Sequence, residues 1–260
     1  MTQTDDSGSL PISAVLITRD AEYHLELVLR ALGVCSEIVV LDSGSTDRTR
    51  EIADAHGAVW HEHPFDGYGP QKRRAVGLAA NDWILSIDAD EVLDDEGVTA
   101  LAAIDWSRAD PRDCWTIRRR PFIGDREIRH GHWVPDDVVR IFNRRSHNVS
   151  DVAIHESVHP TGPVHRLGGS LLHYSYLDLA ELFRTDYFRL KAEVFRARGQ
   201  RAGGAVLAAR CGAAFVNSYV IRRGFLDGAA GVVVALAAAA HSVVGLALAS
   251  TDQTGSSSRA

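Results

Sequence analysis

Short apolar runs alternate with amphipathic stretches through the first ninety residues. Residues 12–18, 37–41 and 83–87 are nearly continuous apolar runs, which is typical of strands buried on both faces. Between them, residues 21–32, the stretch ending at Gly57 and residues 71–80 have helical patterns, and residues 58–60 predict a short further strand. This alternation predicts an α/β fold with a mostly parallel, doubly wound sheet that binds ligands at the carboxyl ends of its strands.

The pattern changes beyond residue 105. Residues 114–119, 138–142 and 153–158 predict short strands, whereas residues 177–198, 203–222 and 226–249 predict helices. We therefore expect two halves of an α/β domain and a helical extension, flanked by disordered ends that are rich in Ser, Thr, Gly and Asp. The expected boundaries are 1–10, 11–105, 106–176, 177–251 and 252–260.

Composition and charge exclude several protein classes. The 260 residues are 45% hydrophobic and 24% charged, which excludes a disordered or collagen-like chain. Three widely spaced cysteines argue against a disulfide framework and favour the cytoplasm. The net charge of −6 argues against a nucleic-acid partner. The charge is uneven, however: residues 1–183 carry −12 and residues 184–223 carry +7.

A run without formal charge, Gly228–Thr251, follows the basic segment. Its 24 residues would form a helix about 36 Å long, enough to cross a bilayer. Nine are alanine and only eight are valine or leucine, so the free energy of full insertion is near break-even. We expect peripheral association with the inner face of the cell membrane, in preference to a helix packed on the catalytic domain or a second subunit.

Acidic side chains follow two of the predicted strands. Asp88 and Asp90 come directly after the strand at 83–87, and two such carboxylates can share a divalent cation with diphosphate oxygens. The turn from Asp42 to Asp47 offers hydroxyls and backbone amides to a nucleotide, although a capped helix start would look the same. Neither Gly-x-Gly-x-x-Gly nor a P-loop motif is present, which argues against dinucleotide enzymes and P-loop NTPases.

Seven stretches together resemble family 2 glycosyltransferases with the GT-A fold, most closely the lipopolysaccharide-core glucosyltransferase-like branch. They are ISAVLITRDAE (12–22), EIVVLDSGSTDRTREIADAHGA (37–58), DGYGPQKRRAVGLAANDWILSIDADEVL (66–93), GHWVPDDVVRIFNRR (131–145), AIHESV (153–158), LLHYSY (171–176) and RRGFLDGAAG (222–231). The resemblance implies a Rossmann-like GT-A domain, with residues 11–105 as the nucleotide-sugar-binding half and residues 106–176 as the acceptor-side half. The helical patterns and the uncharged run add a C-terminal helical, membrane-associated extension.

The resemblance also implies residue roles. Asp42 corresponds to the acidic residue at the uracil, Asp90 to a ligand of Mg²⁺ or Mn²⁺, and Asp20 or Glu22 to a residue of the first nucleotide loop. Many relatives have Asn near Arg74, where this chain departs from the pattern. The expected nucleotide-binding residues are Thr18, Asp20, Asp42, Ser43, Gln71, Lys72, Arg74 and Asp88.

Two carboxylates are alternative candidates for the catalytic base. An inverting transfer, which the resemblance implies, requires a carboxylate close to the acceptor hydroxyl. Asp136 and Glu156 both lie in the acceptor-side half, and His155 is a candidate metal ligand. The structural alternatives are a turn cap for Asp136 and an ion pair with an arginine such as Arg140 for Glu156.

The expected activity is metal-dependent transfer of a hexose, glucose from UDP-glucose, onto a glycolipid or polysaccharide precursor such as lipopolysaccharide core. One alternative is a nucleotidyltransferase acting on a sugar phosphate, but the loop Thr18–Glu22 lacks the glycines and basic residues that such enzymes use. The other is a membrane-docked, non-catalytic module that binds nucleotide sugars, against which the intact Asp42, Asp88 and Asp90 argue. The pattern does not determine an oligomeric state.

Overall fold

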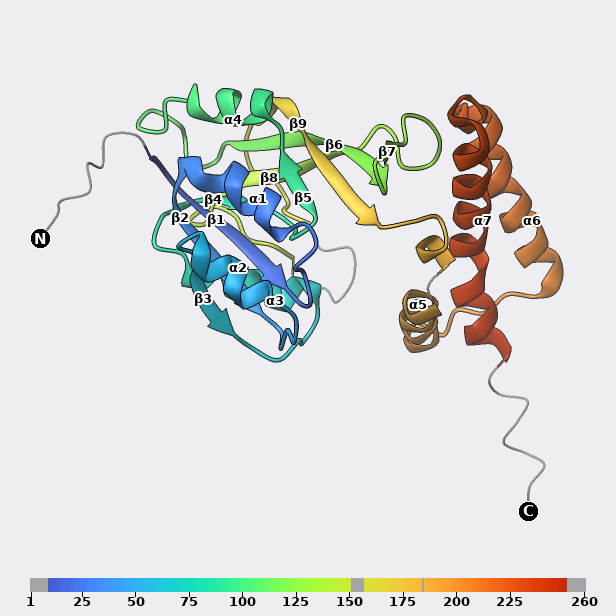
Figure 1. Cartoon of the computed structure of the whole chain (residues 1–260). Coiled ribbons are helices and arrows are strands. Elements are labelled where there is room, and N and C mark those ends of the chain that lie inside the picture. The colour runs from blue at the N-terminus through green and yellow to red at the C-terminus, as the bar shows by residue number, and fades with distance from the viewer. Residues whose placement is uncertain (1–8, 151–156, 184, 252–260) are drawn as a thin grey trace, which may run out of the picture. The chain divides into compact units, whose positions relative to one another are not determined.

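The computed structural model describes residues 9–150, 157–183 and 185–251 (Figure 1). The described chain divides into two compact units. The first, the sheet unit, contains residues 1–119 and 136–174, and the second, the helical unit, contains residues 120–135 and 175–260. The predicted halves placed residues 120–135 before the helical extension. In the structure this segment groups with the helices, so the division is not a single cut along the chain.

Parallel strands form the first part of the sheet unit. The order β3-β2-β1-β4 is parallel throughout, and helices connect its strands in the predicted alternation. The strands are β1 (Leu10–Thr18), β2 (Cys35–Asp42), β3 (Val59–Glu62) and β4 (Trp83–Ser86), and the helices are α1 (Leu25–Ala31), α2 (Thr49–Ala55) and α3 (Tyr68–Leu78). The N-terminal half therefore has the expected doubly wound arrangement.

The remaining strands pair antiparallel, so the sheet as a whole is mixed. Strand β8 (Asp137–Asn143) joins β4 to β6 (Cys114–Ile123), and β5 (Glu91–Leu93) pairs with β9 (Val164–Tyr176). A two-residue strand, β7 (Arg126–Glu127), pairs with the end of β6, and α4 (Asp95–Ala102) follows β5. Residues 151–156, which include most of the strand predicted at 153–158, lie outside the described residues.

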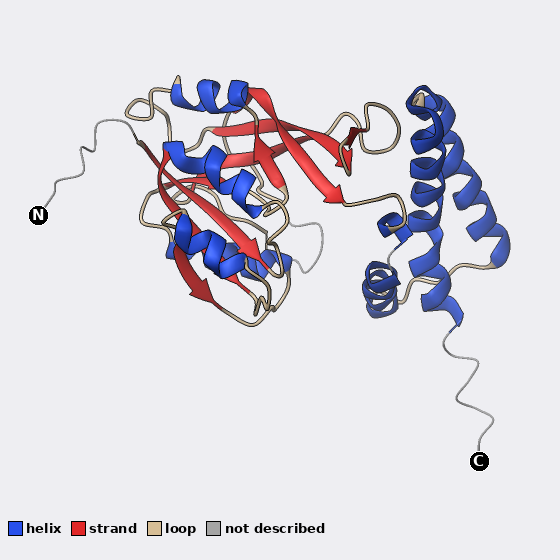
Figure 2. Cartoon of the chain, viewed as in Figure 1, coloured by secondary structure: helices blue, strands red, loops and turns tan. Residues whose placement is uncertain are grey.

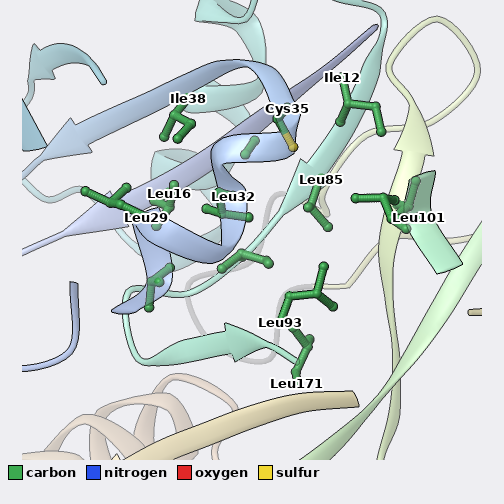
Figure 3. Packing of buried hydrophobic residues seen from close by; sticks show 14 of the residues in the cluster. Ile12, Leu16, Leu29, Leu32, Cys35, Ile38, Leu85, Leu93, Leu101 and Leu171 are labelled. Atoms are coloured by element: carbon green, nitrogen blue, oxygen red, sulfur yellow. The ribbon is translucent and has the colours of Figure 1, made fainter. Parts of the chain in front are cut away.

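Alternating residues of β1 are buried in two clusters, one on each face of the sheet. Ile12 and Leu16 contribute to the cluster that contains Leu29 of α1 (Figure 3), whereas Val15 contributes to the cluster that contains residues of α3. Burying a leucine or isoleucine fully stabilises the fold by about 1.5–3 kcal/mol. Because both faces are covered, the polar ends of the strands are left to form the site.

Between residues 185 and 251 the helical unit consists of helices and loops (Figure 2). Helix α7 (Gly228–Thr251) packs against both α5 (Thr185–Ala197) and α6 (Gly204–Val216), and one π-helical turn, Asn217–Ile221, extends α6. Glycine permits one close approach: a Cβ on Gly231 would lie 1.8 Å from the carbonyl oxygen of Gly224.

Two described segments, 204–221 and 224–251, are long and apolar enough to cross a bilayer by length and composition. Only the second was anticipated from the sequence. They differ in burial: 6% of the first is buried inside the protein, compared with 39% of the second. Packed helices of soluble proteins pass the same test, so this finding only weakly suggests membrane association.

Candidate active site

The loops that follow β1 and β2 are joined through the carboxylate of Asp42, which is 2% exposed. Its Oδ1 accepts hydrogen bonds from Thr18 Oγ1 at 2.8 Å and Ser45 Oγ at 2.5 Å. Its Oδ2 accepts from the backbone N–H groups of Gly44 and Ser45, each at 2.7 Å. Burial opposes ionisation of Asp42, but these hydrogen bonds outweigh it and lower the pKa of the carboxyl group. Asp42 therefore holds the loops that follow β1 and β2 together.

Asp20 connects the loop after β1 to the loop after β2 by hydrogen bonds. Its backbone has a φ of 47°, its N–H donates to Ser45 Oγ at 2.8 Å, and its Oδ1 accepts from the Thr46 N–H at 2.8 Å. Glu22 instead accepts from the backbone N–H of Arg48 at 3.2 Å. Of the two acidic alternatives, Asp20 is therefore the one brought to Ser45, which also contacts Asp42.

Helix α3 presents two of its three candidate residues to the ends of the strands, Gln71 beside β2 and Lys72 beside β4. Gln71 is fully buried, and its Nε2 donates to Ser43 Oγ at 3.0 Å and to the carbonyl oxygen of His63 at 3.1 Å. Lys72 is also buried and points to Asp88. Arg74 is exposed and pairs with Asp66 at 2.9 Å. Thus the structure separates Arg74 from the hydrogen bonds and ion pairs that involve Gln71 and Lys72.

Asp88 is held by a cation on each oxygen. Lys72 Nζ lies 2.6 Å from its Oδ1, and an Arg140 guanidinium nitrogen lies 2.7 Å from its Oδ2. Burial disfavours the charged carboxylate, but Arg140 and Lys72 more than compensate and hold the pKa of Asp88 well below its usual range. Asp88 is consequently ionised, and both of its oxygens are occupied by cations of the protein itself.

A chain of ion pairs continues from Asp88 across the sheet unit. Arg140 also donates to Glu91, which is fully buried, and Glu91 Oε1 lies 3.4 Å from an Arg119 nitrogen. Arg119 Nε donates to Asp136 Oδ2 at 2.8 Å. We call the sequence Asp88–Arg140–Glu91–Arg119–Asp136 the ion-pair chain. It connects the acidic motif after β4 with the candidate base before β8.

The three central residues of the ion-pair chain were not anticipated from the sequence. Arg140 was expected only as a partner for Glu156, and Glu91 and Arg119 were given no role. A signal was present: Arg140 interrupts the apolar run Val138–Phe142, and a charge inside a buried strand requires a partner. The partner itself is not visible in the sequence, because Glu91 is 49 residues away.

Asp90 is the more accessible carboxylate of the motif. Its side chain is 38% exposed, and Oδ2 lies 3.6 Å from His173 Nε2. Burial lowers the pKa of His173, but the hydrogen bond and charge of Asp90 outweigh it and raise that pKa. No group of three His, Cys, Asp or Glu side chains that could hold a metal occurs among the described residues. One exposed carboxylate fits a hard cation that completes its shell with diphosphate oxygens and water.

The structure describes only one of the two candidate bases, Asp136. Asp136 lies at the end of the ion-pair chain, where Arg119 occupies Oδ2 and Oδ1 accepts no hydrogen bond from the described residues. Its side chain is 35% exposed. Glu156 and the candidate metal ligand His155 both lie outside the described residues.

Comparison with known proteins gives consistent matches. The family model described as glycosyl transferase family 2 matches residues 25–161, more than half of the chain. The lipopolysaccharide core biosynthesis glycosyltransferase LpsC of Rhizobium meliloti is 33% identical over 206 residues, covering 74% of each chain. An uncharacterized glycosyltransferase of Rickettsia prowazekii is 28% identical over 237 residues, covering 85% of this chain and 80% of its own.

Among solved structures, glucosyl-3-phosphoglycerate synthase from Mycobacterium tuberculosis, in complex with Mn²⁺, UDP and glucosyl-3-phosphoglycerate, is 24% identical. The match covers 46% of this chain and 45% of that one, with a TM-score of 0.33. The overlap is too loose to transfer site residues from that enzyme.

Proposed function

Because the chain belongs to glycosyl transferase family 2, we propose that it moves glucose from UDP-glucose onto a glycolipid or polysaccharide precursor, such as lipopolysaccharide core. The 33% identical relative named for lipopolysaccharide core biosynthesis supports this acceptor class. The donor, UDP-glucose, is the one that the resemblance to the glucosyltransferase-like branch of the family implies. One observation supports the site most strongly. The loop bearing Asp42 and the motif bearing Asp88 and Asp90 follow strands that both pair in parallel with β1, at the end where α/β sheets bind ligands.

Each part of the site has a task in this proposal. The loops fastened by Asp42 and Asp20 receive the nucleoside, and Ser43 and Gln71 define the wall beside it. Asp90 would hold Mg²⁺ or Mn²⁺, which when bound neutralises charge on the departing diphosphate. Lys72 and Arg140, fixed by Asp88, keep two positive charges beside that position.

Asp136 is the proposed base. An acceptor hydroxyl attacks the anomeric carbon as its proton passes to a carboxylate, and the carbon's bond to the diphosphate oxygen breaks on the opposite face. Arg119 fixes the orientation of the Asp136 carboxylate while leaving Oδ1 for that proton. Glu156 is the alternative base, and it would receive the proton in the same way.

The proposed second partner is the cytoplasmic surface of the cell membrane. Residues 184–223 carry a net charge of +7, and each Lys or Arg near an anionic surface contributes about 1 kcal/mol to binding. Full insertion is less favourable for α6, because Arg210 at the middle of a span would cost about 2.5–3.5 kcal/mol. We therefore propose a peripheral enzyme rather than a membrane-spanning one.

A donor screen tests the activity. Purified full-length protein is incubated with several nucleotide sugars and Mg²⁺ or Mn²⁺, and nucleoside diphosphate release is measured. We expect release from UDP-glucose, its loss with EDTA, and its loss in Asp90→Ala with an unchanged melting temperature. Asp95→Ala is the matched control, because Asp95 is an exposed carboxylate on the same segment. Release that survives both EDTA and Asp90→Ala would refute the metal site.

A further inference from the structure

Helix α6 and the π-turn that extends it expose apolar side chains that the described residues do not cover. Val206 is 54% exposed, Val216 47%, Val220 54% and Ile221 71%. No residue of α6 itself is buried. We infer that residues 204–225, defined here as the docking segment, lie in the plane of an anionic lipid bilayer with this apolar surface inserted. This rests on the proposed membrane partner and narrows it to one element.

Unpaired positive charge accompanies the apolar surface. Arg198, Arg201, Arg210 and Arg223 are exposed, and none forms an ion pair with the described residues. In the sheet unit, by contrast, most arginines have a carboxylate partner. Apolar side chains flanked by uncompensated arginines complement a surface that has an apolar interior and negatively charged headgroups.

Aromatic rings mark the end of the docking segment. Phe215 and Tyr219 stack with centroids 5.5 Å apart, and Tyr219 meets Phe225 edge-on at 6.2 Å. Phe225 is 47% exposed. Aromatic side chains beside arginines are typical of the level where headgroups meet acyl chains. This supports placement at the membrane surface over contact with a purely apolar protein partner.

Helix α7 was the expected anchor, but its contacts suit a helix inside a bundle. His241 Nε2 donates to the carbonyl oxygen of Leu182 at 2.9 Å, and Lys191 Nζ donates to the carbonyl oxygen of His241 at 3.2 Å. Ala230, Val234 and other small residues on its packed side are buried. A helix that holds α5 and the turn before it through these contacts is less available to lipid than α6 is.

Vesicle flotation of the full-length protein tests the docking segment. The vesicles contain phosphatidylcholine with or without phosphatidylglycerol. We expect the wild-type protein to float with the anionic vesicles, and less so at high salt. Val220→Asp with Ile221→Asp, and separately Val206→Asp, should each lower the vesicle partition coefficient about tenfold. Melting temperatures should stay unchanged, because the substituted side chains are exposed.

Two matched variants make the outcome decisive. Leu27→Asp, on an α1 side chain that is 45% exposed, should float as the wild type does. Leu236→Asp, on an α7 side chain that is 49% exposed, should weaken flotation less than the α6 variants do. If Leu236→Asp releases the protein and the α6 variants do not, the membrane partner stands and the docking segment is wrong.

Two further results would overturn the inference. Failure of the wild-type protein to float with anionic vesicles would refute the membrane partner and the docking segment together, while nucleoside diphosphate release would still test the transferase. If the α6 variants float normally but change the mass measured by light scattering, the surface instead joins two copies of the chain.

Discussion

The sheet unit and the helical unit stabilise themselves in different ways. In the sheet unit, charges are buried in pairs, as in the ion-pair chain, and the apolar residues lie beneath them in two clusters. In α6 and α7 the residues are mostly alanine, glycine and valine, and α7 is closely packed at Gly231. Arg198, Arg201, Arg210 and Arg223 form no ion pair with the described residues. Fixed charge suits a site that handles a nucleotide diphosphate, whereas uncompensated charge suits an external anionic surface.

The largest effect, a loss of turnover, is expected from a substitution of Asp136 at the end of the ion-pair chain. Asp136→Asn keeps the shape of the side chain but cannot accept the acceptor's proton. Turnover should therefore fall about 10²–10⁴-fold while donor binding is nearly unchanged. Single-turnover kinetics and calorimetry with UDP measure the two quantities. Asp137→Asn, in which an exposed pair with Arg118 is lost, serves as the control. Near wild-type turnover in Asp136→Asn would transfer the role of base to Glu156.

A stability measurement tests whether the sheet unit depends on its buried charges. Glu91→Ala leaves Arg140 and Arg119 without the carboxylate between them, and breaking a buried ion pair costs about 3–5 kcal/mol. Urea unfolding measures the loss. Glu26→Gln, in an exposed pair with Arg30, should change the free energy of unfolding by less than about 1 kcal/mol. Equal losses in the two variants would mean that the sheet unit depends no more on its buried ion pairs than on its exposed ones.

The stability of the helical unit should depend on the volume of its side chains rather than on their charge. Gly231→Ala places a methyl group where the Gly224 carbonyl oxygen lies 1.8 Å away, so the backbone must shift, at a cost of about 1–3 kcal/mol. Gly212→Ala is the matched control, since nothing lies within 4 Å of the added atom and alanine favours a helix by about 1 kcal/mol. Thermal melts of both variants give the comparison, and a stabilised Gly231→Ala protein would contradict the close packing.

The smallest effect concerns the pH dependence contributed by Asp42. Its pKa in the folded protein lies below the ordinary 3.8, so its ionised form stabilises the fold above about pH 4. That contribution should be lost as the pH falls through the folded pKa. Asp42→Asn should therefore lower stability by a constant amount between pH 7 and 5, about 1–3 kcal/mol for a buried donor left unpaired. The difference in stability between wild type and Asp42→Asn should shrink at acidic pH. A difference that grows there would mean that folding raises the pKa of Asp42 instead of lowering it.

The parallel half of the sheet could be predicted because its strands are continuous apolar runs. Residues 83–87 are apolar apart from Ser86, and Asp88 follows them, so both the strand and its chemistry are evident along the chain. The partners of Asp88 could not be predicted in this way, because Lys72 precedes it and Arg140 follows it on other elements of the chain. A pattern of burial identifies a residue that needs a partner but does not identify the partner.

One strand was missed for a local reason. Strand β5 has only three residues and directly follows an acidic turn, so no alternation can develop in it. Helix α7 was expected to be the membrane element because its run lacks formal charge, whereas the more exposed α6 was expected only to be a helix. Exposure follows from which helix occupies the middle of the bundle, and composition alone does not determine that.

Residues 120–135 leave the sheet unit at Arg119 and return to it at Asp136, two positions at which the ion-pair chain has a member. A chain truncated after residue 174 would therefore keep a segment whose folding partners had been removed. Arg126 would lose the Asp227 carbonyl oxygen, and the His130 ring would lose the Asp227 carboxylate. Cloning the catalytic unit by itself requires a short linker in place of 120–135 as well as the C-terminal cut.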